Sequence, residues 1–396
     1  MKVEFINDNK LDGIKYDFDL LRKDYTKLKC PKKVYNPNHI PYESNKWNII
    51  LSDRSRGKTT NILLFGLCMF WRYRNGLLYI RNDKSMITQG NVGRLFNTII
   101  EWGYVEKLTN GEYNGIIYKS MKHEWYFVNY DSDGEIEKED TKPCCIALSI
   151  DQNERYKSNL VTTYDFVVYD EFIERVYTPS LFISLVDLLK TIGRDRQSMV
   201  INALSNTVDL YSPFFSEFGI SDVVETMNMG DRIDTLSPFG THIFVEILGE
   251  KKGNEKIKHT KVNQMYYGFK NPKLASVTGT STWAMYNYPH TPEKLTIIKK
   301  NHYIHFMGKL INMELCQDDN GVVFVNCHIA TKTYDDSIIY SLDFHTESNY
   351  RYKKGFTKID DYIWDKYEKN LFTYSNNSVG SMVEKYLDGC KTDRKR

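Results

Sequence analysis

The chain has 396 residues, of which 41% are apolar and 26% are charged, so it can bury a sizeable core beneath an ordinary polar surface. Its 53 lysines and arginines nearly balance its 51 aspartates and glutamates, and the formal net charge of +2 excludes a strongly basic histone-like protein and an acidic disordered tail. The seven cysteines form no C-x-x-C pair, which favours buried thiols in a reducing compartment over a zinc site. Because the N-terminus has no apolar stretch typical of a secretory signal, we expect a soluble intracellular protein.

Apolar runs in the first part of the chain predict strands that alternate with helices. The expected strands are 47–51, 77–81, 161–169 and 199–204, and the expected helices are 58–71, 86–103 and 180–192. A hairpin is expected at 112–130, where tyrosine and isoleucine alternate with polar residues. This order of elements is typical of an α/β domain in which helices cover both faces of a parallel sheet.

The sequence pattern changes after residue 248. A charged segment, 249–275, reads as a linker, and beyond it strands are expected at 295–305, 307–316, 321–330 and 337–342, followed by a helix at 358–390. We therefore expect three parts, which are 1–248, 249–275 and 276–396. The last part is a smaller α+β domain. Basic residues in the linker and in the tail suit contact with nucleic acid, and equally suit a solvated linker and a frayed end.

One segment carries the chemistry of a phosphate-binding loop. It fits the pattern G-x-x-x-x-G-K-[ST] with serine in place of the first glycine, and it comprises Ser52, Asp53, Arg54, Ser55, Arg56, Gly57, Lys58 and Thr59, followed by Thr60. An apolar strand precedes the segment and an apolar helix follows, as a loop that wraps its N–H groups around phosphates requires. Its lysine would reach phosphate oxygens and its threonine hydroxyl would bind Mg²⁺, so the loop predicts ATP and Mg²⁺ as cofactors. An incidental strand–turn–helix is the alternative.

Two acidic residues, Asp170 and Glu171, follow the strand expected at 161–169. A carboxylate at the end of such a strand joins the Mg²⁺ shell of phosphate-loop enzymes, which assigns Asp170 to the metal. Glu171 lies where a base can orient and polarise an attacking water, which hydrolysis needs. Two solvated acids at a strand end are the other interpretation.

Polar residues near the strand expected at 199–204 are further candidates. Asn206 follows this strand and can touch the γ-phosphate or the attacking water, although an ordinary turn explains it as well. Arg194 and Arg196 follow the helix expected at 180–192. Arginines there complement the helix dipole or, across a subunit boundary, stabilise charge on a transferred phosphoryl group.

Together these segments resemble the genome-packaging ATPases of small tailed phages of the phi-twenty-nine type, which are compact relatives of the large terminases. The residues that carry the resemblance are Tyr35-Asn36-Pro37, the phosphate loop, Lys157-Ser158-Asn159, Asp170-Glu171-Phe172-Ile173, Arg194-x-Arg196, Leu204-Ser205-Asn206 and Ser212-Pro213-Phe214-Phe215. Their order and approximate spacing hold from about residue 35 to residue 248, whereas the C-terminal third agrees only in its strand pattern and charged linker.

The resemblance implies a P-loop NTPase domain of the additional-strand, catalytic-glutamate type. Such proteins form a ring, typically a pentamer, on the portal of an empty capsid in the host cytoplasm, without a membrane, and hydrolyse ATP with Mg²⁺ to drive double-stranded DNA inward. A scaffold RNA is left open as a further partner. Ser52 departs from the glycine of the family and alters the entrance of the loop without removing a catalytic group.

The resemblance also implies roles for single residues. Lys58 and Thr59 would hold phosphates and Mg²⁺, with Asp170 on the metal and Glu171 as the catalytic base. Asn206 would couple hydrolysis to movement.

Basic residues would act at the boundary between subunits. Arg194 would act in trans on the ATP of a neighbouring subunit, with Lys157 as a second basic residue near that boundary. Arg196 is an alternative to both.

The C-terminal domain of the family is similar to a ribonuclease-H-type nuclease that has lost its acids. The acids available in this chain are Glu314, Asp318, Asp319, Asp335, Asp336 and Asp343, most of them in expected turns. A two-metal nuclease needs carboxylates that converge on paired ions, so we expect no nuclease. Two alternatives to a packaging motor stay open. One is another ring-forming translocase or helicase, and the other is a nucleic-acid-binding subunit with a degenerate nucleotide site.

Overall fold

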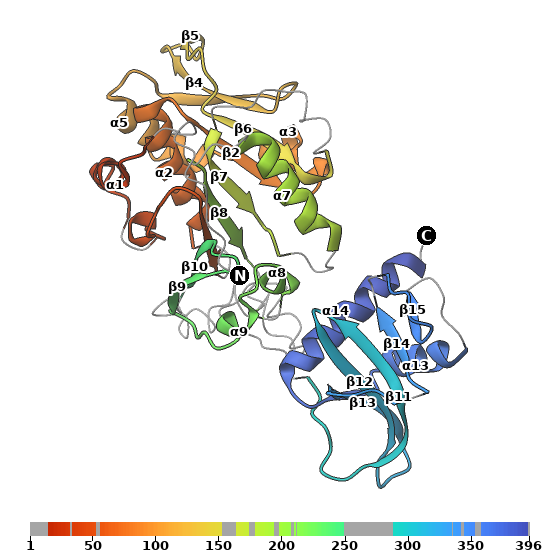
Figure 1. Cartoon of the computed structure of the whole chain (residues 1–396). Coiled ribbons are helices and arrows are strands. Elements are labelled where there is room, and N and C mark those ends of the chain that lie inside the picture. The colour runs from red at the N-terminus through yellow and green to blue at the C-terminus, as the bar shows by residue number, and fades with distance from the viewer. Residues whose placement is uncertain are drawn as a thin grey trace, which may run out of the picture.

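Two separate sheets organise the computed structural model of the chain (Figure 1). The structure describes residues 15–248 and 288–394, apart from 32–33, 53–55, 153–163, 174–178, 194–197, 207–209, 211, 335, 342–343 and 353–357. The expected linker, 249–275, lies outside the described residues. The first sheet belongs to the part that the sequence assigns to an α/β domain, and the second belongs to the expected smaller domain.

The first sheet has a parallel centre and antiparallel edges. Its strands are β1 (Lys46–Leu51), β2 (Gly76–Arg81), β3 (Gly115–Lys119), β4 (Glu124–Tyr130), β5 (Ile136–Glu139), β6 (Cys145–Ser149), β7 (Tyr164–Asp170), β8 (Val200–Ser205), β9 (Arg232–Leu236) and β10 (His242–Ile247). Their order is β3-β4-β6-β2-β7-β8-β1-β10-β9, with β5 paired to β4. Strand β8 lies between β1 and β7 and is parallel to both, so it separates the strand before the phosphate loop from the strand that ends in Asp170.

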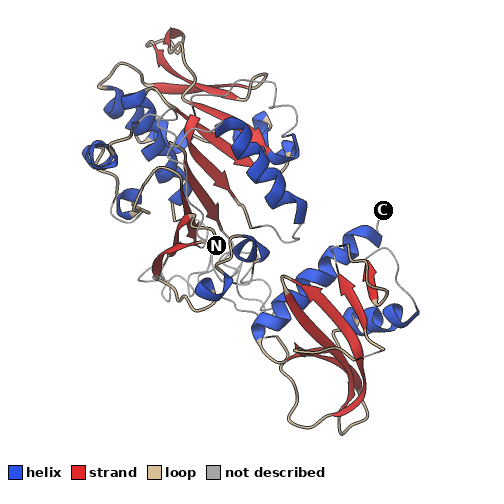
Figure 2. Ribbon diagram, viewed as in Figure 1, coloured by secondary structure: helices blue, strands red, loops and turns tan. Residues whose placement is uncertain are grey.

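Helices cover both faces of this sheet (Figure 2). They are α1 (Phe18–Lys27), α2 (Lys58–Tyr73), α3 (Gln89–Val92), α4 (Asn97–Glu101), α5 (Tyr104–Thr109), α7 (Pro179–Gly193), α8 (Pro213–Glu217) and α9 (Ser221–Val224), with short 3₁₀ turns η1 (Pro37–His39), η2 (Lys84–Ile87) and η3 (Ile150–Gln152). Along β7 the side chains alternate, with Phe166 and Val168 in the core beneath α2 and Val167 and Tyr169 in the core beneath α7. A strand buried on both faces needs such a continuous apolar run, which explains why the sequence revealed it.

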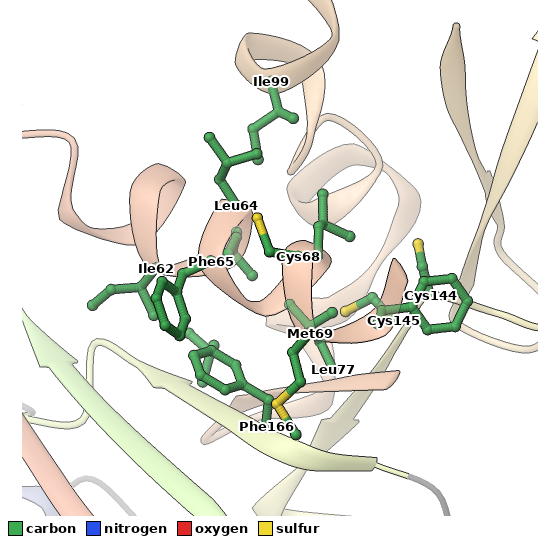
Figure 3. Packing of buried hydrophobic residues seen from close by; sticks show 14 of the residues in the cluster. Ile62, Leu64, Phe65, Cys68, Met69, Leu77, Ile99, Cys144, Cys145 and Phe166 are labelled. Carbon is green, nitrogen blue, oxygen red and sulfur yellow. The ribbon is translucent and has the colours of Figure 1, made fainter. Parts of the chain in front are cut away.

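Helix α2 is the best-buried helix of the first domain. Apart from Gly66, its residues from Ile62 to Phe70 have no more than 1% exposure. Figure 3 shows five of them, Ile62, Leu64, Phe65, Cys68 and Met69, within the cluster of buried hydrophobic residues. Phe65 packs against Phe166 of β7 with ring centroids 6.0 Å apart. This packing fixes the N-terminus of α2, which follows the phosphate loop, against the centre of the sheet.

The range 86–103 is helical as expected but is not one continuous helix. It contains the end of η2 and the short helices α3 and α4, and α5 begins directly after it at Tyr104. Glycines at 90, 93 and 103 explain the interruption, because glycine is costly inside a helix and Gly103 takes the left-handed φ of 66°. The predicted hairpin at 112–130 is confirmed as β3 and β4.

The second sheet has the order β15-β14-β11-β12-β13-β16. Its elements are β11 (Thr296–Phe306), β12 (Lys309–Gln317), β13 (Val323–Ile329), β14 (Ile338–Ser341), β15 (Tyr350–Tyr352), α13 (Lys358–Glu368), β16 (Phe372–Tyr374) and α14 (Asn377–Arg394). Strands β11, β12 and β13 are antiparallel neighbours, whereas β14 is parallel to β11 and β15 is parallel to β14. Helices α13 and α14 supply side chains to the core on one face of this sheet.

The helix expected at 358–390 is present as two helices, α13 and α14, because β16 divides it. Helix α13 ends before Asn370, which takes a φ of 55°, and Phe372 and Tyr374 then enter the core beside β13. The four predicted strands between 295 and 342 are confirmed within a few residues.

The structure also bears on membrane association and on the cysteines. Among the described residues, no helix is long and apolar enough to cross a membrane. All seven cysteines are free thiols, and all but Cys30 are buried.

Candidate functional site

The phosphate loop connects β1 to α2. The structure describes Ser52, Arg56, Gly57, Lys58, Thr59 and Thr60, whereas Asp53, Arg54 and Ser55 lie outside the described residues. Helix α2 begins directly after Gly57, whose φ of 76° lies in the left-handed region that favours glycine. The N-terminus of a long, buried helix presents N–H groups and a partial positive charge, which together favour an anion.

Backbone hydrogen bonds hold both described ends of the loop. At its entrance the Ser52 N–H donates to the Ser205 carbonyl of β8 over 3.2 Å, and the Ser52 residue is buried. At its exit the Arg56 carbonyl accepts from the Tyr35 N–H over 2.9 Å. Serine thus occupies the position of the expected glycine without a positive φ.

The candidate residues lie together at the carboxyl ends of three neighbouring parallel strands, β7, β8 and β1. The Lys58 ammonium donates to Asn206 Oδ1 over 2.5 Å, and Asn206 Nδ2 donates to Glu171 Oε1 over 3.3 Å. The Thr59 hydroxyl donates to Asp170 Oδ1 over 3.3 Å. Because β1, β7 and β8 are parallel neighbours, their carboxyl ends bring these five side chains together. Thr60 lies in the same first turn of α2 as Lys58 and Thr59.

Sequence reasoning missed two residues of this site, Tyr79 and Arg81 of β2. Arg81 Nη2 donates to Glu171 Oε2 over 2.5 Å, and Arg81 Nη1 lies 3.7 Å from Asp170 Oδ2. The Tyr79 hydroxyl donates to Asp170 Oδ2 over 3.0 Å. The expected strand 77–81 contains both residues on one face, but only the pairing of β2 with β7 places them beside the two acids.

The two acids differ in exposure. Asp170 is buried, whereas the side chain of Glu171 is 43% exposed and its φ of 56° turns the chain away at the end of β7. Burial raises the pKa of Asp170 above its ordinary value, although Lys58 and Arg81 act in the opposite direction. A further cation beside Asp170 would offset that burial. The oxygen donors of Thr59 and Asp170 are the ligands that Mg²⁺ prefers, so these residues fit the expected metal.

Other expected site residues cannot be placed. Lys157, Arg194 and Arg196 lie outside the described residues, as do Asp335 and Asp343. The ring contacts expected of these basic residues therefore stay predictions.

The described acids of the second domain do not converge. Glu314 lies in β12 and approaches His328 Nε2 at 3.3 Å, whereas Asp318 accepts two N–H groups of its own turn, and Asp336 accepts from Asn301. Within the described ranges there is no group of three or more histidine, cysteine, aspartate or glutamate side chains that could hold a metal.

Comparison with known proteins gives a consistent set of similarities. A family model described as Podovirus DNA encapsidation protein (Gp16) matches residues 31–267. The DNA packaging protein of Bacillus phage phi29 is 25% identical over 202 residues, which are 50% of this chain and 54% of that protein. The chain thus spans about half the length of this curated relative.

Two solved structures share the fold over most of the chain. The viral genome packaging motor assembly of bacteriophage phi-29 has a TM-score of 0.58 at 15% identity and covers 91% of this chain and 100% of its own. The phi-28 gp11 DNA packaging motor has a TM-score of 0.57 at 13% identity and covers 91% of this chain and 99% of its own. At these identities the likeness concerns the fold alone.

Proposed function

The chain belongs to the Podovirus DNA encapsidation protein (Gp16) family, and on this premise we propose that it is an ATP-hydrolysing motor that moves double-stranded viral DNA into a preformed capsid. The observation that carries the ATPase part is the meeting of Lys58, Thr59, Asp170, Glu171 and Asn206 at one sheet edge. The strand order supports the additional-strand type, because β8 is inserted between β1 and β7.

Each of these five residues would have its own role in hydrolysis. Lys58 would bind phosphate oxygens, and Thr59 and Asp170 would hold Mg²⁺, which neutralises charge on the transferred group when bound. Glu171 would orient the attacking water and accept its proton. Asn206 contacts both Lys58 and Glu171, so it can transmit a change at the phosphates to the base.

Glu171 is engaged on both carboxylate oxygens in this conformation. Asn206 donates to Oε1 and Arg81 donates to Oε2. Each carboxylate oxygen has a second lone pair, so a water can still approach Glu171, but it shares each oxygen with a donor. We propose that Arg81 competes with the attacking water for Oε2, because Asn206 donates to Oε1 and connects that oxygen to Lys58.

The proposed motor is a ring of identical subunits, typically a pentamer, that stands on the portal of the capsid. In this ring Arg194 would stabilise the transition state on the neighbouring subunit, with Lys157 near the boundary and Arg196 as the alternative finger. A scaffold RNA is a further partner that the family resemblance leaves open.

For the second domain we propose a ribonuclease-H-like fold without nuclease activity that contacts DNA or the portal. Three antiparallel strands followed on one side by two parallel ones, in the order β13-β12-β11-β14-β15, support this proposal. Glu314 is the only described acid within these strands, and two metal ions need several converging carboxylates. Cleavage of DNA by the purified chain in Mg²⁺ or Mn²⁺, abolished by Glu314→Ala, would overturn it.

The direct test is phosphate release by the purified full chain with and without nucleic acid, combined with the mass of the assembly. A packaging motor hydrolyses ATP faster with double-stranded DNA than with single-stranded DNA, and does so as an oligomer. Stimulation by single strands alone would favour a helicase. A chain that binds DNA but releases no phosphate would favour a binding subunit with a degenerate nucleotide site.

A further inference from the structure

Two consecutive peptide planes at the exit of the phosphate loop are held from outside the loop. The carbonyl of Arg56 accepts from the N–H of Tyr35 over 2.9 Å. The carbonyl of Gly57 accepts from Asn61 twice, from its N–H over 3.0 Å and from its side-chain Nδ2 over 2.8 Å. In a planar trans peptide the N–H points opposite to the carbonyl, so both carbonyl contacts also set the direction of the next N–H group.

The direction set by Asn61 matters for anion binding. The Gly57 carbonyl points along α2 toward Asn61, so the N–H of Lys58 in the same peptide plane points back past the helix N-terminus. That is the side on which a phosphate-binding loop presents its donors. A tilt of this plane would turn the Lys58 N–H away without moving the Lys58 side chain.

Asn61 is itself oriented by a residue of another helix. The hydroxyl of Tyr25, on α1, donates to Asn61 Oδ1 over 2.6 Å. Asn61 is 1% exposed and Tyr25 is 3% exposed, so neither group can exchange its partner for water. The amide nitrogen must face Gly57, since the flipped amide would place Asn61 Oδ1 against the Gly57 carbonyl, and both of these oxygens are acceptors. In this orientation Oδ1 accepts from the Tyr25 hydroxyl.

The surroundings of Gly57 support the same arrangement. A Cβ atom at this position would lie 3.2 Å from Asn61 Nδ2 and 3.3 Å from Val34 Cβ. Asn61 and Val34 therefore hold the glycine between them, and the left-handed φ of 76° adds a second reason for glycine.

We propose that Asn61, oriented by Tyr25, is a positioning residue for the phosphates of the bound nucleotide. The hydrogen bonds from Tyr25 to Asn61 and from Asn61 to Gly57 fix the direction of the Lys58 N–H. This N–H can then donate to a phosphate that nucleoside diphosphates and nucleoside triphosphates both contain. The inference rests on the proposed function, since it requires that this loop binds ATP. Asn61 would affect the binding of the phosphates and would take no part in the chemistry of hydrolysis.

The test measures the affinity of the full chain for ATP and for ADP, together with the turnover at saturating ATP. Asn61→Ala should weaken both affinities about tenfold, the effect of losing about 1.4 kcal/mol. Its turnover at saturating ATP should stay within about threefold of the parent rate. Tyr25→Phe keeps the Asn61 donor but removes its support, so we expect a smaller loss, about threefold.

The matched control is Asn75→Ala. Asn75 is also buried and also makes two side-chain hydrogen bonds, both to Asp165, but it precedes β2 at the opposite edge of the sheet. The Asn75→Ala variant should lower the midpoint of thermal unfolding, as Asn61→Ala does, but it should leave the affinity for ATP and ADP unchanged.

The outcomes separate the inference from the function on which it rests. If the parent chain binds no ATP, the proposed function fails. If the parent binds ATP and Asn61→Ala binds it equally well, or if Asn75→Ala weakens binding as much, the positioning role of Asn61 is wrong.

Discussion

At the scale of single residues, the site is a chain of contacts that runs from Lys58 through Asn206 to Glu171 and on to Arg81. Each contact joins side chains from different segments of the chain, so a change at one end reaches the other through groups that are already in contact. The contribution of each residue can therefore be separated by substitutions that keep the others in position.

Lys58→Ala and Glu171→Gln should both abolish ATP hydrolysis, by different routes. Lys58→Ala removes a charge from the phosphates and should weaken ATP binding as well. Glu171→Gln keeps the shape of the site but cannot accept the proton of the water, so ATP binding should persist. Binding by fluorescence titration and phosphate release measure the two effects. Turnover by Glu171→Gln near the parent rate would show that another group is the base.

Arg81→Ala should raise the hydrolysis of ATP in the absence of DNA. The substitution frees Glu171 Oε2. An ion pair with one partly exposed partner contributes up to about 1 kcal/mol, so the rate should increase up to about fivefold. The control is Arg72→Ala, which breaks a comparable ion pair with Asp24 far from the site and should leave the rate unchanged. A fall in the rate with intact ATP binding would instead make Arg81 part of the catalytic machinery.

At the scale of elements, Glu246 of β10 binds the segment that precedes β1, and β10 is the strand next to β1 in the sheet. Its carboxylate is buried and accepts from the Tyr35 hydroxyl over 2.7 Å and from Arg232 Nε over 2.7 Å, and it lies 2.8 Å from His39 Nε2. The N–H of Tyr35 also donates to the Arg56 carbonyl, so Glu246 supports the phosphate loop indirectly, through Tyr35.

This cluster gives a prediction for the dependence of stability on pH. Burial alone would raise the pKa of Glu246, but hydrogen bonds from His39, Tyr35 and Arg232 lower it below its ordinary value. A lowered pKa means stability that is present above about pH 4.3, the ordinary value, and that disappears as the pH falls through the folded value.

Glu246→Gln should therefore cost about 1.5–3 kcal/mol of unfolding free energy at pH 7, and the difference from the parent should shrink below about pH 4.3. Denaturant unfolding at several pH values measures this difference. Glu106→Gln, at an exposed position of α5, is a control that should change stability little. A difference that is constant from pH 7 to pH 3 would show that the charge of Glu246 contributes nothing to stability.

Elements with a strong local pattern could be predicted from the sequence, and those set by tertiary contacts could not. Strand β7 was evident because its side chains are buried on both faces, Phe166 and Val168 on one face and Val167 and Tyr169 on the other. Strand β16 was missed because its three residues are identified only by pairing with β13. Likewise, Arg81 was missed because the order of strands, which the sequence does not reveal, makes β2 the neighbour of β7.

At the scale of the whole molecule, the proposed ring requires that one subunit completes the site of the next. Arg194 follows α7 in the sequence and lies outside the described residues, so its role can be tested only in the assembly. Arg194→Ala should bind ATP but hydrolyse it about 10³–10⁵-fold more slowly, because a guanidinium would no longer meet the transition state.

Mixing Arg194→Ala with Lys58→Ala should restore part of the activity, since a mixed boundary can pair an intact phosphate loop with an intact arginine. Phosphate release measures the recovery, and mass measurement of the mixture confirms that the variants assemble together. A mixture that assembles but stays inactive would place Arg194 within its own subunit and make Arg196 or Lys157 the candidate.

The central claim is that hydrolysis at this site moves the protein along double-stranded DNA. The most direct measurement is the displacement of a third strand from a DNA triplex by the assembled full chain. We predict displacement that requires ATP and is lost in Glu171→Gln, although that variant still binds ATP and DNA. Hydrolysis of ATP by the parent chain without displacement of the third strand, on DNA that it demonstrably binds, would contradict the account.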